Sequence, residues 1–435
     1  MTAEIAVMNR EAIALASDSA VTMMGEADQK IFTSANKLFA LSKYHPVGIM
    51  VYGSATLMAV PWETIIKTYR NGVGRKRYDT LEEHADAFIQ FLDNGNPLFP
   101  DYVQEDYVRS TIYSYLDFIK EAIKEKVHSV IDKKGSIAEE MTKQIISETI
   151  TGQYEDWERA ENIPSIPKNY NRNIANKYGD IIDKAIEEIF EKVPLSKGQL
   201  KELRKIAGSL FSKFPENIER ENTSGAVIAG FGYKDTFPSL EAFDIEGIAN
   251  NRLKYKQYTS ARIDFETSAS IIPFARGEMV ATFMEGVDPT YRDVEESYLS
   301  EVFRRYAEII LENIKGGNHR QNRKLKEKLT TMGTGILEDL KKKLEAHRNE
   351  IYTSPITRVV SMLPKDELAV MAETLVSLTS FKLKVTMESE TVGGPIDVAV
   401  ISKGDGFIWI KRKHYFQSEL NPQFFATYYE EELNE

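Results

Sequence analysis

Apolar and polar positions along this chain are arranged in blocks, and each block predicts its own kind of structure. Residues 3–16 hold two short apolar runs separated by Asn9, Arg10 and Glu11, which predicts a β-hairpin. Residues 31–41 and 48–52 predict a second pair of strands. Four short strands that follow one another with no helix between them indicate an antiparallel sheet.

From Ser54 to Ile218 the pattern becomes helical. Apolar residues recur at three- and four-residue spacing in five segments, namely residues 81–92, 108–127, 137–149, 176–191 and 200–211. Strands are then predicted again, at residues 225–231, 239–243 and 251–265. The first two of these strands flank a turn at residues 232–235.

A second helical block follows, and the chain then returns to strands. The predicted helices are residues 277–285, 294–314, 322–347 and 365–379. The last predicted strands, residues 397–402 and 407–411, flank Gly404, Asp405 and Gly406, a strong hairpin signal. This order differs from the regular strand–helix alternation of a parallel α/β fold. It predicts an α+β fold in which helices cover two antiparallel sheets.

Composition limits the kinds of site and partner that the chain can have. The 435 residues are 42% hydrophobic, enough for a sizeable core, and contain no cysteine, which excludes disulfides, cysteine–zinc sites and thiol catalysis. The six histidines lack metal-ligand spacing, so we expect neither a cofactor nor a metal site. A net charge of −11 argues against broad nucleic-acid binding. No apolar run reaches the roughly 18 residues of a membrane span, and no signal peptide is evident, so we expect a cytoplasmic protein that binds no membrane.

Several segments resemble a known family. The stretch from Thr2 to Asp18 resembles mature proteasome β-subunits and their bacterial ring-protease relatives, in which a threonine begins the first strand and an aspartate follows the second. Residues 34–41 resemble the segment that carries the active-site lysine of this family, here Lys37. Residues 48–56 resemble the strand and turn that supply an oxyanion-binding amide, here at Gly53.

Two later stretches agree with the same family. Residues 226–231 with 240–244 resemble its central hairpin, and residues 393–403 resemble a late strand with the pattern Gly-Gly-x-Ile-Asp-Val. The resemblance covers residues 2–75, 223–290 and 363–412. It implies an αββα sandwich of two antiparallel sheets flanked by helices, an N-terminal nucleophile hydrolase fold. The shared core would comprise residues 1–75, 223–290 and 363–435, with helical insertions at 76–222 and 291–362.

The candidate nucleophile can also be argued from chemistry. A hydroxyl needs a base, and a terminal amine, with an unperturbed pKa of roughly 7.7–8.0, can serve as one near neutral pH. Removal of Met1 would place such an amine on Thr2, and no propeptide precedes Thr2, so we expect no self-cleavage. Lys37 would polarise the hydroxyl, and Asp18 would hold Lys37. Met followed by Thr also opens many chains that are not enzymes.

Gly53 would present a backbone N–H to the oxyanion, since glycine allows close approach. A helix that began at Ser54 would add its dipole to this effect. Pro61 leaves two alternatives: it kinks such a helix, or it marks the true helix start.

The sequence also departs from the family. The family carries a helper serine in a Gly-Ser-Gly turn, whereas residues 272–278 contain no serine. Counting back from Gly393 puts Ser389 where a helper aspartate is expected and Val392 where a serine is expected, and Glu388 or Glu390 would fit with a shift of one residue.

Two functions therefore follow from the resemblance. The first is a threonine-type peptidase or amidohydrolase that acts on a peptide or protein substrate. The alternative is a catalytically degenerate scaffold or binding protein. Because the family assembles into rings, either function implies a homo-oligomer.

Overall fold

The computed structural model describes residues 2–24, 29–93, 95–215, 223–313, 319–386, 392–423 and 426. These residues form two compact units. The first unit comprises Met1–Tyr52, Ala229–Leu240 and Ala261–Glu435, and the second comprises Gly53–Ile228 and Glu241–Ser260. The assignment of residues to a shared core and helical insertions stays a prediction.

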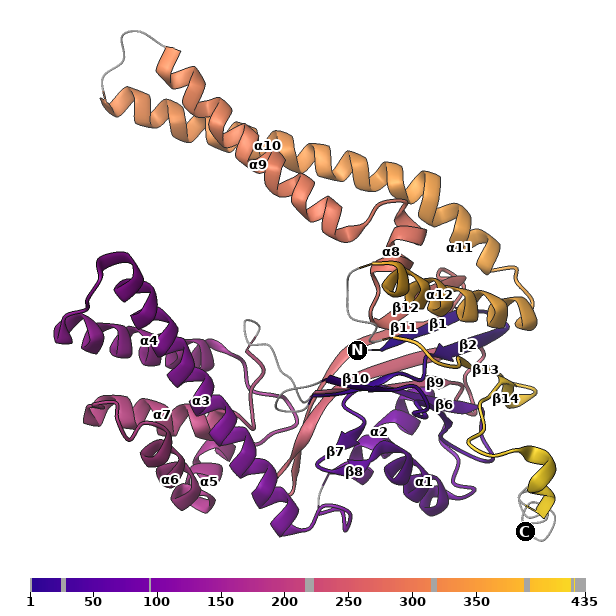
Figure 1. Ribbon diagram of the computed structural model, residues 1–435. Coiled ribbons are helices and arrows are strands. Elements are labelled where there is room, and N and C mark those ends of the chain that lie inside the picture. The colour runs from indigo at the N-terminus through magenta and orange to yellow at the C-terminus, as the bar shows by residue number, and fades with distance from the viewer. Residues whose placement is uncertain are drawn as a thin grey trace. The chain divides into compact units, whose positions relative to one another are not determined.

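The architecture is α+β with two five-stranded antiparallel sheets, as the order of elements predicted (Figure 1). One sheet has the strand order β12 (Ala269–Ala275), β1 (Ala3–Asn9), β2 (Ala12–Ser17), β13 (Asp397–Ser402) and β14 (Gly406–Lys411). The other has the order β11 (Arg252–Arg262), β10 (Ser239–Ala249), β9 (Ser224–Gly230), β6 (Val47–Gly53) and β5 (Leu38–Ala40). The finer assignment as an αββα sandwich stays a prediction.

The β1–β2 hairpin was predicted correctly and is closed by Asn9. The Asn9 Oδ1 atom accepts hydrogen bonds from the backbone N–H groups of Glu11 and Ala12, at 2.9 and 3.2 Å. Its amide nitrogen donates to the carbonyl oxygens of Val360 and Leu363, at 3.0 and 2.9 Å. Every residue of both strands is buried, which explains why they lack the usual alternation of apolar and polar residues.

The two faces of this hairpin pack against different elements of the first unit. Helix α12 (Lys365–Val385) packs on β1, β2 and β13, against the face that carries Ile5 and Ala14. Strand β5 packs on β2 and β13. A Cβ atom added to Gly48 of β6 would lie 2.8 Å from the side chain of Ile401, which the alternation of β13 places on the face opposite α12. The sheet therefore lies between α12 and the β5–β6 pair.

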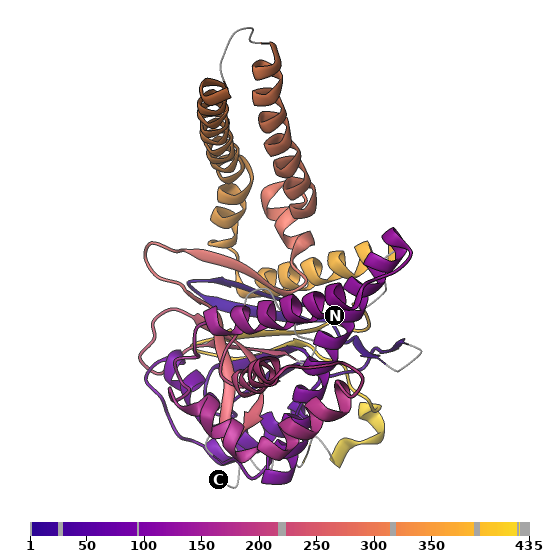
Figure 2. The ribbon, with the colours of Figure 1, turned by 90° about the vertical axis from the view of Figure 1, so that its left-hand side faces the viewer.

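Among the described residues of the first unit, four further helices precede α12. They are α8 (Glu278–Glu285), α9 (Pro289–Asn313), α10 (His319–Arg348) and α11 (Ser354–Val360), with a π-helical turn at Asn349–Thr353 before α11. Helices α9 and α10 run antiparallel and side by side (Figures 1 and 2). The predicted helices at residues 294–314 and 322–347 correspond to this pair.

The second unit is mainly helical. Its helices are α1 (Trp62–Val73), α2 (Leu81–Leu92), α3 (Asp101–Lys134), α4 (Glu139–Arg159), α5 (Tyr170–Lys177), α6 (Gly179–Ile189) and α7 (Lys197–Ser209). The apolar faces of α3 to α7 share one core, which includes Ile112, Ile150 and Ile182. Local signals fix several helix ends, such as the capping box of Ser196 and Gln199 in α7. Among the described residues, no helix combines the length and apolar composition that crossing a membrane requires.

Three details of the predicted elements were wrong. Residues 31–41 do not form one strand, because β4 (Gln29–Phe32) pairs with β3 (Val21–Met24) in a separate ribbon before β5 begins. Strand β12 was not predicted, since Pro273 weakens a strand pattern, but β12 is an edge strand and can accommodate a proline. No helix begins at Ser54: short strands β7 (Thr56–Leu57) and β8 (Val60–Pro61) come first, and Pro61 is the N-cap of α1.

Candidate active site

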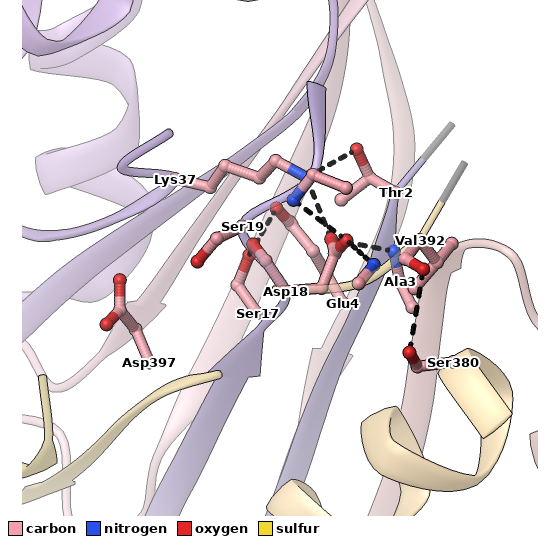
Figure 3. A network of polar contacts seen from close by, with 12 residues as sticks. Thr2, Ala3, Glu4, Ser17, Asp18, Ser19, Lys37, Ser380, Val392 and Asp397 are labelled. Atoms are coloured by element: carbon pink, nitrogen blue, oxygen red, sulfur yellow. Dashed lines mark hydrogen bonds and ion pairs between the residues drawn. The ribbon is translucent and has the colours of Figure 1, made fainter. Parts of the chain in front are cut away.

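Three predicted site residues meet in the first unit. The Lys37 ammonium nitrogen lies 2.9 Å from the Thr2 hydroxyl oxygen and 2.8 Å from Asp18 Oδ1, and it donates to both (Figure 3). Thr2 is 3% exposed, Asp18 1% and Lys37 4%. The attraction within the Lys37–Asp18 ion pair is therefore screened little by solvent. Asp18 and Lys37 lie 16 and 35 positions after Thr2 in the sequence, and the fold brings the three side chains together.

Neighbouring backbone contacts place Lys37 at this position. The segment that leads to Lys37 is held against the end of β2, because the Ala35 N–H donates to the Ser19 carbonyl oxygen at 3.1 Å. The Lys37 carbonyl oxygen in turn accepts a hydrogen bond from the Val51 N–H of β6 at 2.9 Å. Strand β5 begins at the next residue. Lys37 is thus fixed from both sides before its side chain reaches the threonine.

Asp18 accepts hydrogen bonds from four donors among the described residues. In addition to Lys37, its carboxylate accepts from the backbone N–H groups of Ala3, Ala20 and Gly393, at 3.2, 3.1 and 2.9 Å. These donors come from three separate stretches of the chain. Asp18 therefore holds the start of β1, the end of β2 and the segment before β13 together, as well as Lys37.

Gly394 explains part of the Gly-Gly pattern noted in the sequence. Its backbone has a φ of +78°, a conformation that favours glycine, and an added Cβ would lie 2.6 Å from the Thr33 carbonyl oxygen. Glycine at this position therefore lets the segment before β13 pass close to the segment that leads to Lys37. The preceding residue, Gly393, supplies the N–H that binds Asp18.

Glu4 is a member of this cluster that the sequence analysis missed. It lies two residues after Thr2 on β1, so both side chains point to the same face of the strand. Glu4 is 1% exposed, and its Oε1 atom accepts a hydrogen bond from the hydroxyl of Ser17, its register partner on β2, at 3.0 Å. Its other oxygen, Oε2, is buried and has no hydrogen-bond partner among the described residues. A charged residue inside an otherwise apolar strand was the signal that could have revealed it.

Burial dominates the electrostatics of Glu4. Loss of hydration raises the pKa of Glu4 from 4.5 to about 8, although the Lys37 ammonium and the hydrogen bond from Ser17 oppose this rise. The Glu4 carboxyl is therefore mainly protonated at neutral pH. The one ammonium of Lys37 is then balanced by the one carboxylate of Asp18, which limits the cost of burying charge.

Gly53 lies in the second unit, where its own surroundings require a glycine. It ends β6 with a φ of +78°, and an added Cβ would lie 2.3 Å from the Thr223 carbonyl oxygen. The conformation of this turn thus explains the glycine without reference to catalysis. Its part in binding an oxyanion stays a prediction, and the predicted dipole of a helix that begins at Ser54 is wrong, since α1 begins at Trp62.

Ser389 lies outside the described residues, as do Glu388 and Glu390. Val392, at the position expected for a helper serine, is 1% exposed. The Ser380 hydroxyl of α12 donates to the Val392 carbonyl oxygen at 3.5 Å (Figure 3). The region without the other helper serine forms the end of β12 and the start of α8.

Comparison with known proteins gives distant similarities to solved structures alone. No protein-family model and no curated protein matches the chain. Among solved structures, it is similar to a Gly-1 mutant of Anbu from Hyphomicrobium sp. strain MC1. The match has 9% sequence identity and a TM-score of 0.27, and it covers 100% of this chain and 95% of that chain. A TM-score this low does not establish a shared fold.

Proposed function

We propose that this chain is a threonine-type N-terminal nucleophile hydrolase that cleaves peptide or related amide bonds. Thr2 is the nucleophile and becomes the first residue when Met1 is removed. The observation that supports this proposal is the buried contact of the Thr2 hydroxyl with Lys37, which is itself paired with Asp18. This contact puts a positive charge beside the oxygen that would attack, which favours its deprotonation.

The proposed reaction has two stages, in which Thr2 first attacks the amide bond and water then hydrolyses the resulting ester. The Thr2 amine takes the hydroxyl proton while the oxygen attacks the amide carbonyl carbon, and the Lys37 ammonium stabilises the negative charge that develops on Oγ. The resulting tetrahedral intermediate expels the substrate amine, which receives that proton. Water, deprotonated by the Thr2 amine, then attacks the ester carbon and releases the acid and the free hydroxyl.

The Gly53 N–H is proposed to bind the oxyanion of the intermediate. One such donor contributes roughly 3–4 kcal/mol to transition-state stabilisation. Ser389, or a neighbouring glutamate, is proposed as a helper near the Thr2 amine. Both roles follow from the family resemblance and are secondary to the role of Thr2.

The test compares Thr2→Ala with Thr2→Ser in an assay of fluorogenic peptides. We expect Thr2→Ala to lose more than about a thousandfold in rate, while Thr2→Ser keeps measurable activity because it retains a hydroxyl. An electrophilic inhibitor of threonine proteases should label the wild type on residue 2 and leave Thr2→Ala unlabelled. Unchanged hydrolysis by Thr2→Ala would rule the proposal out.

A non-catalytic assembly subunit is the second candidate. The observation that favours it is the absence of serine between β12 and α8, where the family carries a helper. Intact-mass measurement of the purified protein distinguishes the two functions. If Met1 is retained, the α-amine belongs to the wrong residue, and the non-catalytic function is favoured.

A further inference from the structure

The hydrogen-bond geometry around Glu4 favours a protonated carboxyl. The Ser17 hydroxyl lies 3.0 Å from Glu4 Oε1 and 3.1 Å from the Asp18 carbonyl oxygen, but it has a single proton to donate. If Glu4 carries a proton on Oε1, that proton is donated to Ser17 Oγ, and Ser17 donates its own proton to Asp18. Both contacts are then hydrogen bonds. The unpartnered Oε2 is then a neutral carbonyl oxygen, which costs less to bury than a carboxylate oxygen.

Lys37 is the cation that an ionised Glu4 would attract. Glu4 lies in the same cluster (Figure 3), and the Lys37 ammonium acts on its carboxyl electrostatically. An ammonium has three N–H groups, and Lys37 uses two of them on Thr2 and Asp18. The third has no partner among the described residues. A carboxylate at Glu4 would therefore draw this ammonium away from the Thr2 hydroxyl, whereas a neutral carboxyl leaves it in place.

The other charged groups around Glu4 are already balanced. Glu4 points to the face of its sheet that lies opposite α12, because the residues on either side of it pack with α12. On that face Ser17 pairs in register with both Glu4 and Asp397, and Asp397 forms an ion pair with Lys413. The ring of Tyr52 stacks on the aromatic register partner of Glu4 on β12, with ring centroids 6.0 Å apart.

Ionisation of Glu4 would change the net charge of this cluster. Among the described residues, the titratable side chains on the elements around Glu4 are Lys37, Asp18, Asp397, Lys413 and Tyr52. The Thr2 amine joins them when Met1 is removed. Each lysine balances one aspartate, so the side chains sum to zero while Glu4 is protonated. Loss of the Glu4 proton to solvent would leave one uncompensated negative charge beside the Thr2 oxygen.

We propose that Glu4 is a positioning residue of the proposed hydrolase: its neutral carboxyl leaves the Lys37 ammonium to the Thr2 hydroxyl, and its carboxylate withdraws that ammonium and suppresses the reaction. The inference rests on the proposed function of Thr2. Attack by Thr2 develops negative charge on Oγ, which the ammonium stabilises and a second carboxylate opposes. Burial raises the pKa of Glu4 to about 8, so the suppression begins above neutral pH.

The test compares the pH dependence of kcat/KM for a fluorogenic peptide between the wild type and Glu4→Gln. Glutamine imitates the protonated carboxyl, because its NH2 group can donate to Ser17 and it cannot ionise. Each profile is normalised to its own maximum, so that only its shape is compared. We expect the wild type to lose about tenfold between pH 8 and pH 9.5, while Glu4→Gln rises as the Thr2 amine loses its proton and then stays level.

Two further variants complete the test. Glu241 on β10 of the second unit is the matched control: burial raises its pKa to about 7, and Glu241→Gln should keep the wild-type profile. Ser17→Ala keeps Glu4 but removes a hydrogen bond that favours its carboxylate, so the alkaline decline should move up by about half a pH unit.

The outcomes separate this inference from the proposed function. An active wild type without an alkaline decline would overturn the role of Glu4 and leave Thr2 as the nucleophile. The same decline in Glu4→Gln, or an unmoved decline in Ser17→Ala, would overturn it too. Absence of hydrolysis by the wild type at every pH would overturn both proposals.

Discussion

Apolar side chains are usually buried and charged side chains exposed, and the β1–β2 hairpin and helix α9 depart from this rule in opposite ways. The hairpin is apolar and buried, yet it carries Glu4 inside and ends at the buried Asp18. Helix α9 is mostly polar and exposed, yet it presents six large apolar side chains to solvent, namely Tyr291, Val294, Tyr298, Val302, Tyr306 and Ile309. A buried charge has a cost of several kcal/mol unless it is paired, whereas an exposed apolar side chain costs little in the isolated chain.

A buried charge therefore constrains the residues around it much more strongly than an exposed apolar side chain does. In the hairpin, three stretches of backbone and one lysine converge on Asp18, because an unpaired carboxylate could not be buried there. The six exposed side chains of α9 place no comparable demand on the described residues around them. Substitutions in the hairpin should therefore change the free energy of unfolding strongly, and substitutions of these six side chains should change it little.

The largest effect is expected from Lys37→Met. The substitution keeps most of the side-chain volume but leaves the Asp18 carboxylate buried without its counter-charge. We expect unfolding in urea to show a loss of about 3–5 kcal/mol, together with loss of hydrolysis. Adding Asp18→Asn should recover only part of the lost stability and none of the activity, since it removes the uncompensated charge but turns an NH2 group toward backbone N–H groups that the carboxylate accepted. A loss of under about 1 kcal/mol in unfolding free energy for Lys37→Met alone would show that burial of Asp18 does not depend on its pairing with Lys37.

The next effect concerns Glu4 and pH. The folded-state pKa of Glu4 is about 8, above the ordinary value of 4.5, so the folded protein binds more protons than the unfolded chain between these values. The contribution of Glu4 to stability is therefore complete below pH 4.5 and falls as the pH rises to about 8, by up to about 1.4 kcal/mol per pH unit.

Glu4→Gln removes this titration. The difference in unfolding free energy between Glu4→Gln and the wild type should grow in favour of the variant between pH 5 and pH 8 and then level off. Other groups cancel in that difference, which denaturant unfolding at a series of pH values would measure. A constant difference across the range would mean that Glu4 is already ionised at low pH.

A smaller loss is expected from Asn9→Ala, the polar residue at the turn of the same hairpin. The variant removes two hydrogen bonds to the carbonyl oxygens of Val360 and Leu363 and two from the turn backbone. We expect a loss of about 2–3 kcal/mol, independent of pH. The same substitution at the exposed Asn313 of α9 is the control and should change stability by less than about 0.5 kcal/mol.

The sequence predicted the elements whose pattern is local. The hairpin with its turn at Asn9, the helix at residues 81–92 and the strand at residues 397–402 agree closely with the structure. Strand β12 and the β3–β4 ribbon were missed. A proline interrupts the first, and each strand of the second has only four residues, so neither leaves a clear periodic signal.

Only part of the candidate site was predicted from the sequence. Thr2, Asp18 and Lys37 were found through a resemblance in sequence order, and the structure brings their side chains into contact. The charged Glu4 inside an apolar strand was a visible signal, but its meaning depends on burial of both faces of β1, which became clear only from the structure. The backbone donors to Asp18 could not be predicted either, since they depend on how distant segments pack.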